Sequence, residues 1–363
     1  MKPRHWIAAL TLAAATLMQA EILSASPQPP GGLAVADVPQ FVMFGFDDNP
    51  DIDAMEWFTG FLESRSNPAS AGDASRFDGA PVRAAFYSNG KYFATNPGLA
   101  EIHLAAFRAG HEIANHTENH EHGRPFTLEK WRTEIEACTA TFVAAGIPAE
   151  SIRGFRTPFL EHNPATFVAL EALGFTYDTT LEEGEEPDQD GRSHVWPYTL
   201  HDGSPGNARW AKQTGAPAVG SHPSLWEVPI HVLMIPSDAD CERYGVKPGL
   251  RARVGAALKI GYGGGSGEPA DRITGLDWNV LEAAKCEGPE FLAILKHTLD
   301  LRLEGNRAPF MIGGHTALYP SSNLARRRAI EEFVDYALSK SEVRFVTPIQ
   351  LVEWMRSTAA KAK

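Results

Sequence analysis

Short apolar runs alternate with longer amphipathic segments along most of the chain after residue 40. Such runs are typical of buried strands, and segments with apolar positions three and four residues apart are typical of helices. The predicted strands cover residues 41–46, 82–87, 112–114, 152–155, 175–177, 226–234, 310–312 and 344–346. The predicted helices cover residues 99–108, 127–146, 164–173, 289–303 and 324–338. This alternation predicts an α/β fold with a parallel sheet, either open or closed into a barrel.

One segment, residues 182–276, interrupts the alternation because it is rich in glycine, proline and aromatic residues and contains a single clear strand. A long irregular stretch inside a compact domain is usually functional or disordered. The segment holds Trp196, Trp210 and Trp226, and this aromatic content argues against full disorder. We therefore predict one domain over residues 26–363, in which residues 182–276 form a long irregular insertion folded over the domain.

The first residues have the pattern of a secretory signal peptide. A basic start precedes an uncharged apolar stretch over residues 6–18, and small residues follow, with Ala20 and Ala25 as candidate cleavage points. The apolar region of a signal is ~7–15 residues long, whereas a membrane span needs roughly 20. We therefore expect residues 1–25 to be a signal peptide and the mature protein to be periplasmic or secreted, without stable membrane insertion. A short membrane anchor is the alternative.

The charge of the chain limits its partners. The formal net charge is -12, from 45 acidic and 33 basic residues. Nucleic-acid binding depends on lysine and arginine side chains that neutralise phosphates. This balance argues against nucleic acid and against an anionic membrane surface, and it favours an uncharged glycan or a small molecule.

The cysteines allow at most one disulfide within the chain, because there are three of them, Cys138, Cys241 and Cys286. Cys138 shares the apolar face of a predicted helix, so we expect it in the core. Cys241 and Cys286 are then the expected pair in an oxidising compartment.

Polar residues follow the ends of four predicted strands. They are Asp47, Asp48, His116, His120, Arg156 and His315. The loops after parallel strands meet on one face of an α/β fold, so we expect these side chains at a single site. Two histidines four residues apart, together with a carboxylate from another strand, suit a divalent metal ion. Taken singly, the adjacent acids are equally consistent with a solvated turn and the histidines with a capping segment on the surface.

Five short motifs occur in order along the chain. They are Phe46-Asp47-Asp48, His116-Thr117-Glu118-Asn119-His120, Arg156-Thr157-Pro158-Phe159, Asp277-Trp278 and Gly313-Gly314-His315. The second and third fit the patterns H-[ST]-x-x-H and R-x-P-[FY] in full, and the order of all five makes the resemblance specific. Over roughly residues 41–350, the chain resembles the polysaccharide deacetylases of carbohydrate esterase family 4.

The resemblance implies a distorted (β/α) barrel and a hydrolase that removes N-acetyl groups from a chitin-type or peptidoglycan-type glycan. It also implies that Asp48, His116 and His120 bind one divalent metal ion, and zinc is the ion that we expect. Two alternatives are an esterase that removes O-acetyl groups from a xylan-type glycan and a deacetylase-like protein that binds glycan without turnover.

The same resemblance implies a role for each remaining motif residue. Asp47 would be the general base, and Arg156 would hold it ionised and oriented. His315 would be the general acid, with Asp277 tuning its protonation. The expected substrate-binding residues are Phe159, whose backbone N–H would stabilise the oxyanion, and Trp278, which would pack beside the acid.

Three positions depart from the family pattern. Gly45 stands in place of the usual threonine, and Asn49 in place of a glycine, a mild change because asparagine tolerates positive φ. Gly313 replaces a leucine that, in the family, helps to form the wall of the acetyl pocket. The sequence therefore does not determine the shape of that pocket. We expect the three tryptophans of the insertion to offer aromatic platforms to sugar rings; the alternative is that they only anchor the insertion.

Overall fold

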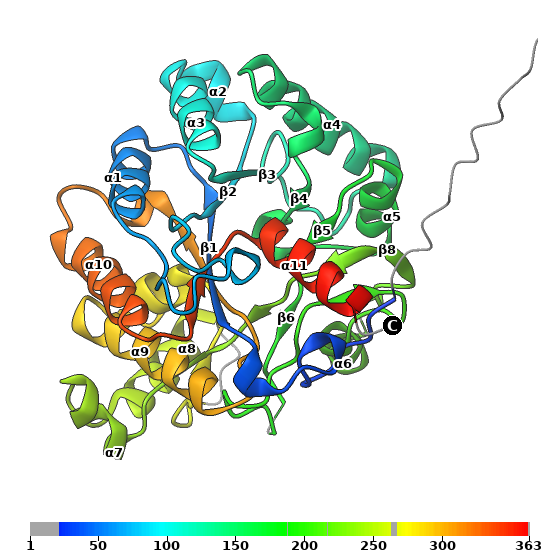
Figure 1. The fold of residues 1–363 in the computed structure, drawn as a ribbon. Helices are drawn as coiled ribbons and strands as arrows, with labels where there is room; N and C mark the ends of the chain where they lie inside the picture. Colours follow the sequence, from blue (N-terminus) through cyan, green and yellow to red (C-terminus); the bar gives the residue numbers. More distant parts are fainter. Residues whose placement is uncertain (1–21, 187, 216, 263–266, 362–363) are drawn as a thin grey trace, which may run out of the picture.

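The computed structural model describes residues 22–186, 188–215, 217–262 and 267–361. Its main sheet contains β1 (Gln40–Asp48), β2 (Ala85–Ser88), β3 (Glu112–Asn115), β4 (Gly154–Phe155), β5 (Tyr177–Asp178), β7 (Tyr198–Leu200), β8 (His222–Glu227), β12 (Phe310–His315) and β13 (Val343–Phe345). The order is β12-β1-β2-β3-β4-β5-β8-β7, and β13 also pairs with β1. All pairs are parallel except β7 with β8. The strands lie at the centre with helices around them (Figure 1), which confirms the predicted distorted barrel.

The helices that surround the sheet are mostly those that the sequence predicts. They are α1 (Ile52–Glu63), α2 (Lys91–Thr95), α3 (Gly98–Arg108), α4 (Leu128–Ala144), α5 (Pro164–Ala172), α9 (Pro289–Glu304), α10 (Leu324–Leu338) and α11 (Pro348–Lys361). The Thr127 side chain caps α4 by accepting a hydrogen bond from the Lys130 N–H. The sequence analysis missed α1, α2 and α11. In α1, the aromatic residues and Gly60 have low helix propensity and obscure the pattern.

Strand β1 is buried on both faces, which explains its continuous apolar run. Phe44 faces the outer helices, where its ring meets that of Phe58 from α1 at 5.2 Å. Phe41 faces the opposite way and meets Trp354 of α11 at 4.8 Å. Helix α11 crosses the sheet at one end (Figure 1), so it closes the barrel interior there and leaves the carboxyl ends of the strands for a site.

The predicted insertion is more ordered than its composition indicated. It contains β7 and β8 of the main sheet together with α6 (Pro205–Thr214), α7 (Asp238–Cys241), α8 (Leu250–Tyr262) and the short strands β6 (Glu182–Glu183), β9 (Ile230–His231), β10 (Leu233–Met234) and β11 (Arg272–Ile273). The prediction of one strand over residues 226–234 is wrong. Pro229 has no N–H to donate to a strand partner, and β8 ends before it.

The expected aromatic platforms are wrong for two of the three tryptophans. The exposed fractions of Trp196 and Trp226 are 2% each, so neither ring is available to a sugar. Both belong to the apolar cluster inside the barrel, and the Trp196 ring stacks on Trp354 at 6.4 Å. Their role is therefore to anchor the insertion. The side chain of Trp210 lies outside the part of the chain that the structure describes.

The expected disulfide is also wrong, because Cys138, Cys241 and Cys286 are all free thiols. Cys286 lies 3.6 Å from a guanidinium nitrogen of Arg253, and Cys241 lies against the carbonyl oxygen of Pro236. The predicted core position of Cys138 is confirmed, since its side chain is fully buried on the inner face of α4.

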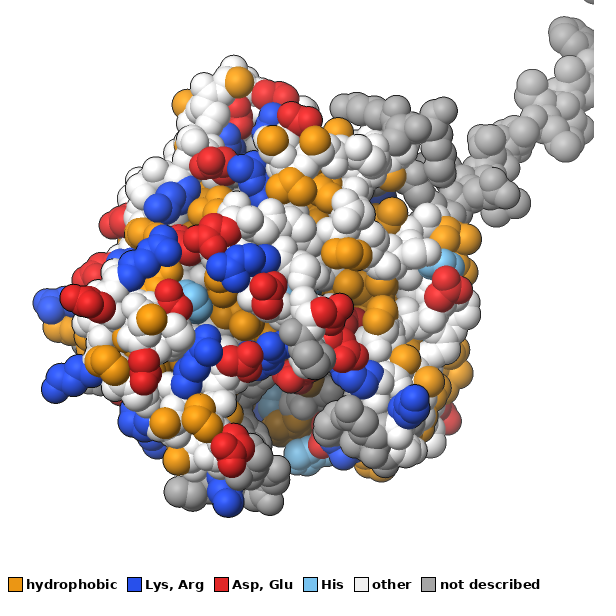
Figure 2. Space-filling model, turned by 90° about the horizontal axis from the view of Figure 1, so that it is seen from below, with side chains coloured by type: hydrophobic (Ala, Val, Ile, Leu, Met, Phe, Trp, Pro, Cys, Tyr) orange, Lys and Arg blue, Asp and Glu red, His pale blue; other side chains and the backbone are white. Residues whose placement is uncertain are grey.

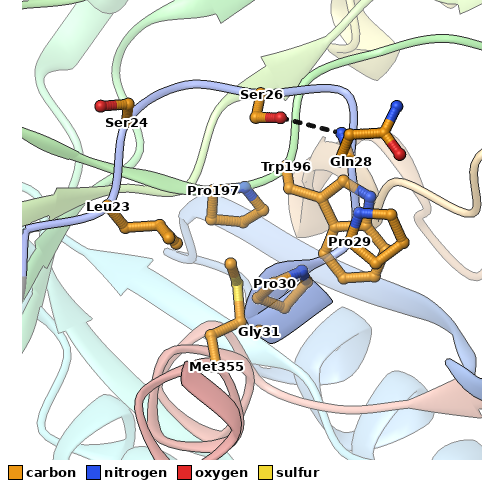
Figure 3. Close-up of a pocket in the computed structure, with 10 residues that line it drawn as sticks. All are labelled: Leu23, Ser24, Ser26, Gln28, Pro29, Pro30, Gly31, Trp196, Pro197 and Met355. Carbon is orange, nitrogen blue, oxygen red and sulfur yellow. Dashed lines mark hydrogen bonds between the residues drawn. The ribbon is translucent and has the colours of Figure 1, made fainter. Parts of the chain in front are cut away.

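The predicted signal peptide lies almost wholly outside the described residues, which begin at residue 22. The first described residues, which include the end of the predicted signal peptide, pair with the edge of the sheet. The N–H of Thr199 donates to the Leu23 carbonyl at 2.9 Å, and that of Trp196 donates to the Ser26 carbonyl at 2.8 Å. Figure 3 shows this segment around a cavity of about 120 Å³, with Met355 of α11 on the other side. In the described part of the chain, no helix combines the length and apolarity that a bilayer crossing requires.

Candidate metal centre and active site

The register of the sheet brings the predicted residues to one end of the barrel. Asp47, near the end of β1, is the direct neighbour of His315, the last residue of β12. On the other side of β1, Asp48 neighbours Ser88 of β2, and β3 follows with the loop that carries His116 and His120. The residues that followed different strands in the sequence therefore meet in space.

Asp48, His116 and His120 form a compact group that could hold a metal ion, and one possible ligand atom from each lies within 4.8 Å of the others. The Asp48 Oδ1 atom is 3.1 Å from His120 Nε2 and 3.6 Å from His116 Nε2. This carboxylate oxygen is buried and makes no hydrogen bond within the protein. Two imidazole nitrogens around an unsatisfied carboxylate oxygen fit a divalent ion such as zinc.

The tautomer of His116 is also suited to a metal ligand. Its Nδ1 donates to the carbonyl oxygen of Arg156 at 2.8 Å, which leaves the Nε2 lone pair directed at Asp48. Burial lowers the pKa of His116 to about 3 and also lowers the pKa of His120. Neutral imidazole is the form that binds metal, so both rings are ready for a ligand at neutral pH.

Backbone conformations of high energy are concentrated at this site. Ten described residues other than glycine have positive φ, and more than half of them belong to the loops at this end of the barrel. Those six are Asp48, Asn49, Thr117, His120, Phe159 and Leu160. Such residues persist only where the surroundings fix them, and they are typical of functional sites. The Asn49 side chain donates to the Phe46 carbonyl at 2.8 Å and to Ser88 Oγ at 3.0 Å, so asparagine suits this position.

Asp47 forms a buried ion pair with Arg156, whose Nη1 lies 2.6 Å from Asp47 Oδ1. The guanidinium also donates to the carbonyl oxygens of Gly45 and Thr179, each at 3.1 Å, and lies over the ring of Tyr87. A Cβ atom at residue 45 would lie 3.0 Å from both the guanidinium and that ring, which explains the glycine. Burial lowers the pKa of Arg156, but the charge of Asp47 and its hydrogen bond raise it, and the net change is upward.

His315 is held by Asp277 through two contacts. The His315 Nδ1 atom lies 2.8 Å from Asp277 Oδ1, and its backbone N–H donates to Oδ2 at 2.9 Å. Burial lowers the pKa of His315, but the charge and hydrogen bond of Asp277 outweigh it and raise the pKa to about 9. The ring is therefore protonated at neutral pH, and the His315 side chain is 23% exposed.

The two residues expected to bind substrate, Phe159 and Trp278, have exposed aromatic side chains. Phe159 is 53% exposed and Trp278 is 46% exposed. The Phe159 ring meets the ring of His120 edge-on at 4.5 Å and stacks on His122 at 4.1 Å. Its position against a ligand histidine places an apolar surface beside the metal group.

Leu276 fills the space left by Gly313. The two residues form a parallel bridge, and the N–H of Gly313 donates to the carbonyl oxygen of Gly275 at 2.9 Å. A Cβ atom at residue 313 would overlap the side chain of Leu276. An apolar side chain thus occupies the space beside Gly313, where the family has a leucine side chain. It comes from Leu276, the residue before Asp277.

The sequence analysis missed the residues that follow β2. Lys91 Nζ donates to the carbonyl oxygen of Asn119 in the histidine loop at 3.1 Å. Burial, and after it the charge of Asp48, raises the pKa of Tyr92, so this side chain also lies near the metal group. Asn89-Gly90 is a turn sequence directly after a predicted strand. Because the other site residues also follow strands, this turn could have suggested Lys91 and Tyr92.

Known proteins resemble this chain in sequence and in fold. Residues 39–177 match the family described as polysaccharide deacetylase. Chitin deacetylase 1 of Bombyx mori is 27% identical over 345 residues, which cover 92% of this chain and 54% of that protein. Chitin deacetylase 8 of Bombyx mori is 27% identical over 336 residues, covering 90% of this chain and 73% of that protein. The chain therefore spans about half the length of the first relative and about three quarters of the second.

A solved structure from Mycobacterium smegmatis, described as a polysaccharide deacetylase, shares the fold. Its TM-score is 0.52 at 18% sequence identity, and the match covers 92% of this chain and 96% of that chain. At the strand ends of its curled parallel sheet, this chain brings together two carboxylates and three histidines. The family match over residues 39–177 and the two chitin deacetylase relatives support the polysaccharide deacetylase family, carbohydrate esterase family 4, as the family that this chain resembles.

The packing of Leu276 over Gly313 gives a stability prediction. We expect Gly313→Ala to lower the free energy of unfolding by about 1–3 kcal/mol, because the added methyl group overlaps a packed side chain. Urea unfolding measures the change. Gly60→Ala is the control, since a Cβ atom there meets nothing within 4 Å. Adding Leu276→Ala should restore part of the loss, and equal stability of Gly313→Ala and wild type would contradict the packing.

Proposed function

We propose that this protein is a metal-dependent deacetylase that hydrolyses N-acetyl groups of a chitin-type or peptidoglycan-type glycan. One observation carries the proposal: the metal-ligand group of Asp48, His116 and His120 lies beside a base that is paired with a buried arginine. A histidine paired with a buried carboxylate stands next to that base. Simple glycan binding needs no such combination of ligands, base and acid.

The side chains have separate tasks in amide hydrolysis. A bound divalent ion supplies Lewis-acid activation of water and of the acetyl carbonyl. Asp47 accepts a proton from the attacking water, and Arg156 orients the carboxylate through their ion pair. The backbone N–H near Phe159 stabilises the negative charge on the carbonyl oxygen as the C–O bond forms. His315 delivers its proton to the sugar nitrogen as the C–N bond breaks, which turns a poor leaving group into a neutral amine.

The surface is consistent with a glycan partner outside the cytoplasm. The net charge is -12, and Figure 2 shows acidic and basic side chains interspersed over one face. A polyanion would need a concentration of basic side chains. Together with the signal-like pattern of the first 25 residues, this supports an exported enzyme that acts on an uncharged or weakly charged polysaccharide.

Acetate release tests the proposal directly. The chain is treated with a chelator and assayed on chitooligosaccharides, peptidoglycan and acetylxylan, before and after zinc is added. We expect zinc-stimulated acetate release from one of the N-acetylated glycans. Release from acetylxylan alone would assign the O-acetyl esterase activity instead. Binding of glycan without any acetate release would show a non-catalytic protein.

Loss of the base should separate catalysis from metal binding. We expect Asp47→Asn to retain zinc and to lower kcat by roughly 100-fold or more, the usual scale for general-base catalysis. The amide keeps the size of the carboxylate but cannot accept the proton. Steady-state kinetics and zinc analysis on the same sample measure both properties. Near-normal kcat in the substituted enzyme would remove Asp47 from the reaction.

The pH profile should report the pair formed by His315 and Asp277. The acid must be protonated, so activity should fall as pH rises through about 9, the pKa of His315. Asp277→Asn removes the charge that raises this pKa, so the alkaline limb of kcat/KM should move at least one unit toward the ordinary value of 6.5. Asp271→Asn, which removes a carboxylate paired with Arg272, is the control. An alkaline limb at the same pH in wild type and Asp277→Asn would refute the assignment.

A further inference from the structure

The loop that supplies both histidine ligands has an unfavourable backbone. Thr117 has φ of 67° and His120 has φ of 52°. The left-handed region is uncommon for residues other than glycine, and it is especially unfavourable for the β-branched Thr117. Without external contacts this loop would relax, and the two imidazole rings would lose their common orientation toward Asp48. The loop must therefore be fixed by residues outside it.

Glu134, in the middle of α4, supplies such contacts. Its two carboxylate oxygens accept hydrogen bonds from the backbone N–H and the side-chain amide of Asn119, both at 2.9 Å. Its backbone carbonyl accepts the N–H of Glu118 at 3.1 Å. The Glu134 side chain is only 2% exposed, so water competes little for these bonds. One residue thus holds the two positions directly before His120.

The carboxylate is not needed to attach α4 to the barrel. Trp131, Ile135 and Cys138 from the same helix are completely buried in the apolar core, and these side chains hold the helix in place. Lys130 neutralises the buried charge, with Nζ 2.7 Å from Glu134 Oε1. The Glu134 carboxylate is thus buried, neutralised and hydrogen-bonded to Asn119 of the loop. This arrangement suits a residue that holds the loop in position.

We propose that Glu134 is a positioning residue that fixes the His116–His120 loop for metal binding through Asn119. The inference rests on the proposed metal site of Asp48, His116 and His120 and deepens it. Residues outside the ligand set that orient the ligands typically change metal affinity by 10–100-fold when they are removed. Glu134 acts through the backbone before His120, so its loss should free the ring of that ligand first.

Zinc affinity measured on the full chain tests the inference without any need for activity. The metal-free protein is titrated with zinc in competition with a chromophoric chelator. We expect Glu134→Ala to raise the Kd for zinc by about 10–100-fold. Glu134→Gln should give a smaller increase, because its oxygen can still accept the Asn119 N–H. Asn119→Ala should also give a smaller increase, because it removes one of the two bonds and keeps the backbone N–H.

Glu136→Gln is the matched control, because this carboxylate lies on the same helix but is exposed and pairs only with Arg132 at 3.4 Å. Its zinc affinity should equal that of wild type. Thermal unfolding of the metal-free proteins separates a stability effect from positioning. A lower melting temperature with unchanged zinc affinity in Glu134→Ala would overturn the inference.

If Glu134→Ala does not fold, Glu134→Gln and Asn119→Ala decide the question in the same assay. Unchanged zinc affinity in both would overturn the inference. If wild type and Glu136→Gln do not bind zinc, the metal site itself is refuted, and the positioning role with it. Zinc binding by wild type without acetate release would contradict the proposed function, while weaker zinc binding by the Glu134 variants would still support the positioning role.

Discussion

Arg156 connects the two halves of the candidate site, and the rest of the arrangement depends on it. Its guanidinium holds the Asp47 carboxylate at 2.6 Å, while its backbone carbonyl accepts the Nδ1 proton of His116 at 2.8 Å. The side chain thus orients the expected base, and the main chain orients a metal ligand. A guanidinium is costly to bury unless its donors are satisfied. Here Asp47, two carbonyl oxygens and the Tyr87 ring satisfy it.

This buried charge accounts for features that would otherwise look unrelated. Residue 45 is glycine because the guanidinium and the Tyr87 ring occupy the space of a side chain. Across the strand pair, Gly313 admits Leu276, and this approach brings the next residue, Asp277, onto His315. Because Gly45 on β1 and Gly313 on β12 have no side chains, Arg156 and the adjacent pair Leu276 and Asp277, from two other segments, can meet at the strand ends.

The sequence predicted the parts of the site that are carried by strand ends. Asp47, Asp48 and His315 follow or end apolar runs. Parallel pairing brings the ends of such strands together, whatever the conformation of the loops that connect them. Features that depend on distant packing could not be predicted in this way. Glu134 looks like any charged residue on an amphipathic helix, and its buried contact with Asn119 appears only when α4 packs against the loop.

The same limit explains the errors in the insertion. Composition showed that tryptophans were present but not which side of a strand they face, so buried Trp196 and Trp226 could not be told from exposed platforms. The cysteine count allowed a pair, but pairing needs close approach of the two backbones, which the chain order does not reveal. Pattern and motif order were sufficient for the fold class, while burial and side-chain direction needed the structure.

Zinc content is the most direct test of the claim that Asp48, His116 and His120 form a metal centre. The protein is loaded with zinc, dialysed and subjected to elemental analysis, together with His120→Ala and His122→Ala. His122 is the control because it lies two residues away with a side chain that is 69% exposed. We predict one zinc per chain in wild type and in His122→Ala, and a large loss in His120→Ala. Undiminished zinc in His120→Ala would contradict the account.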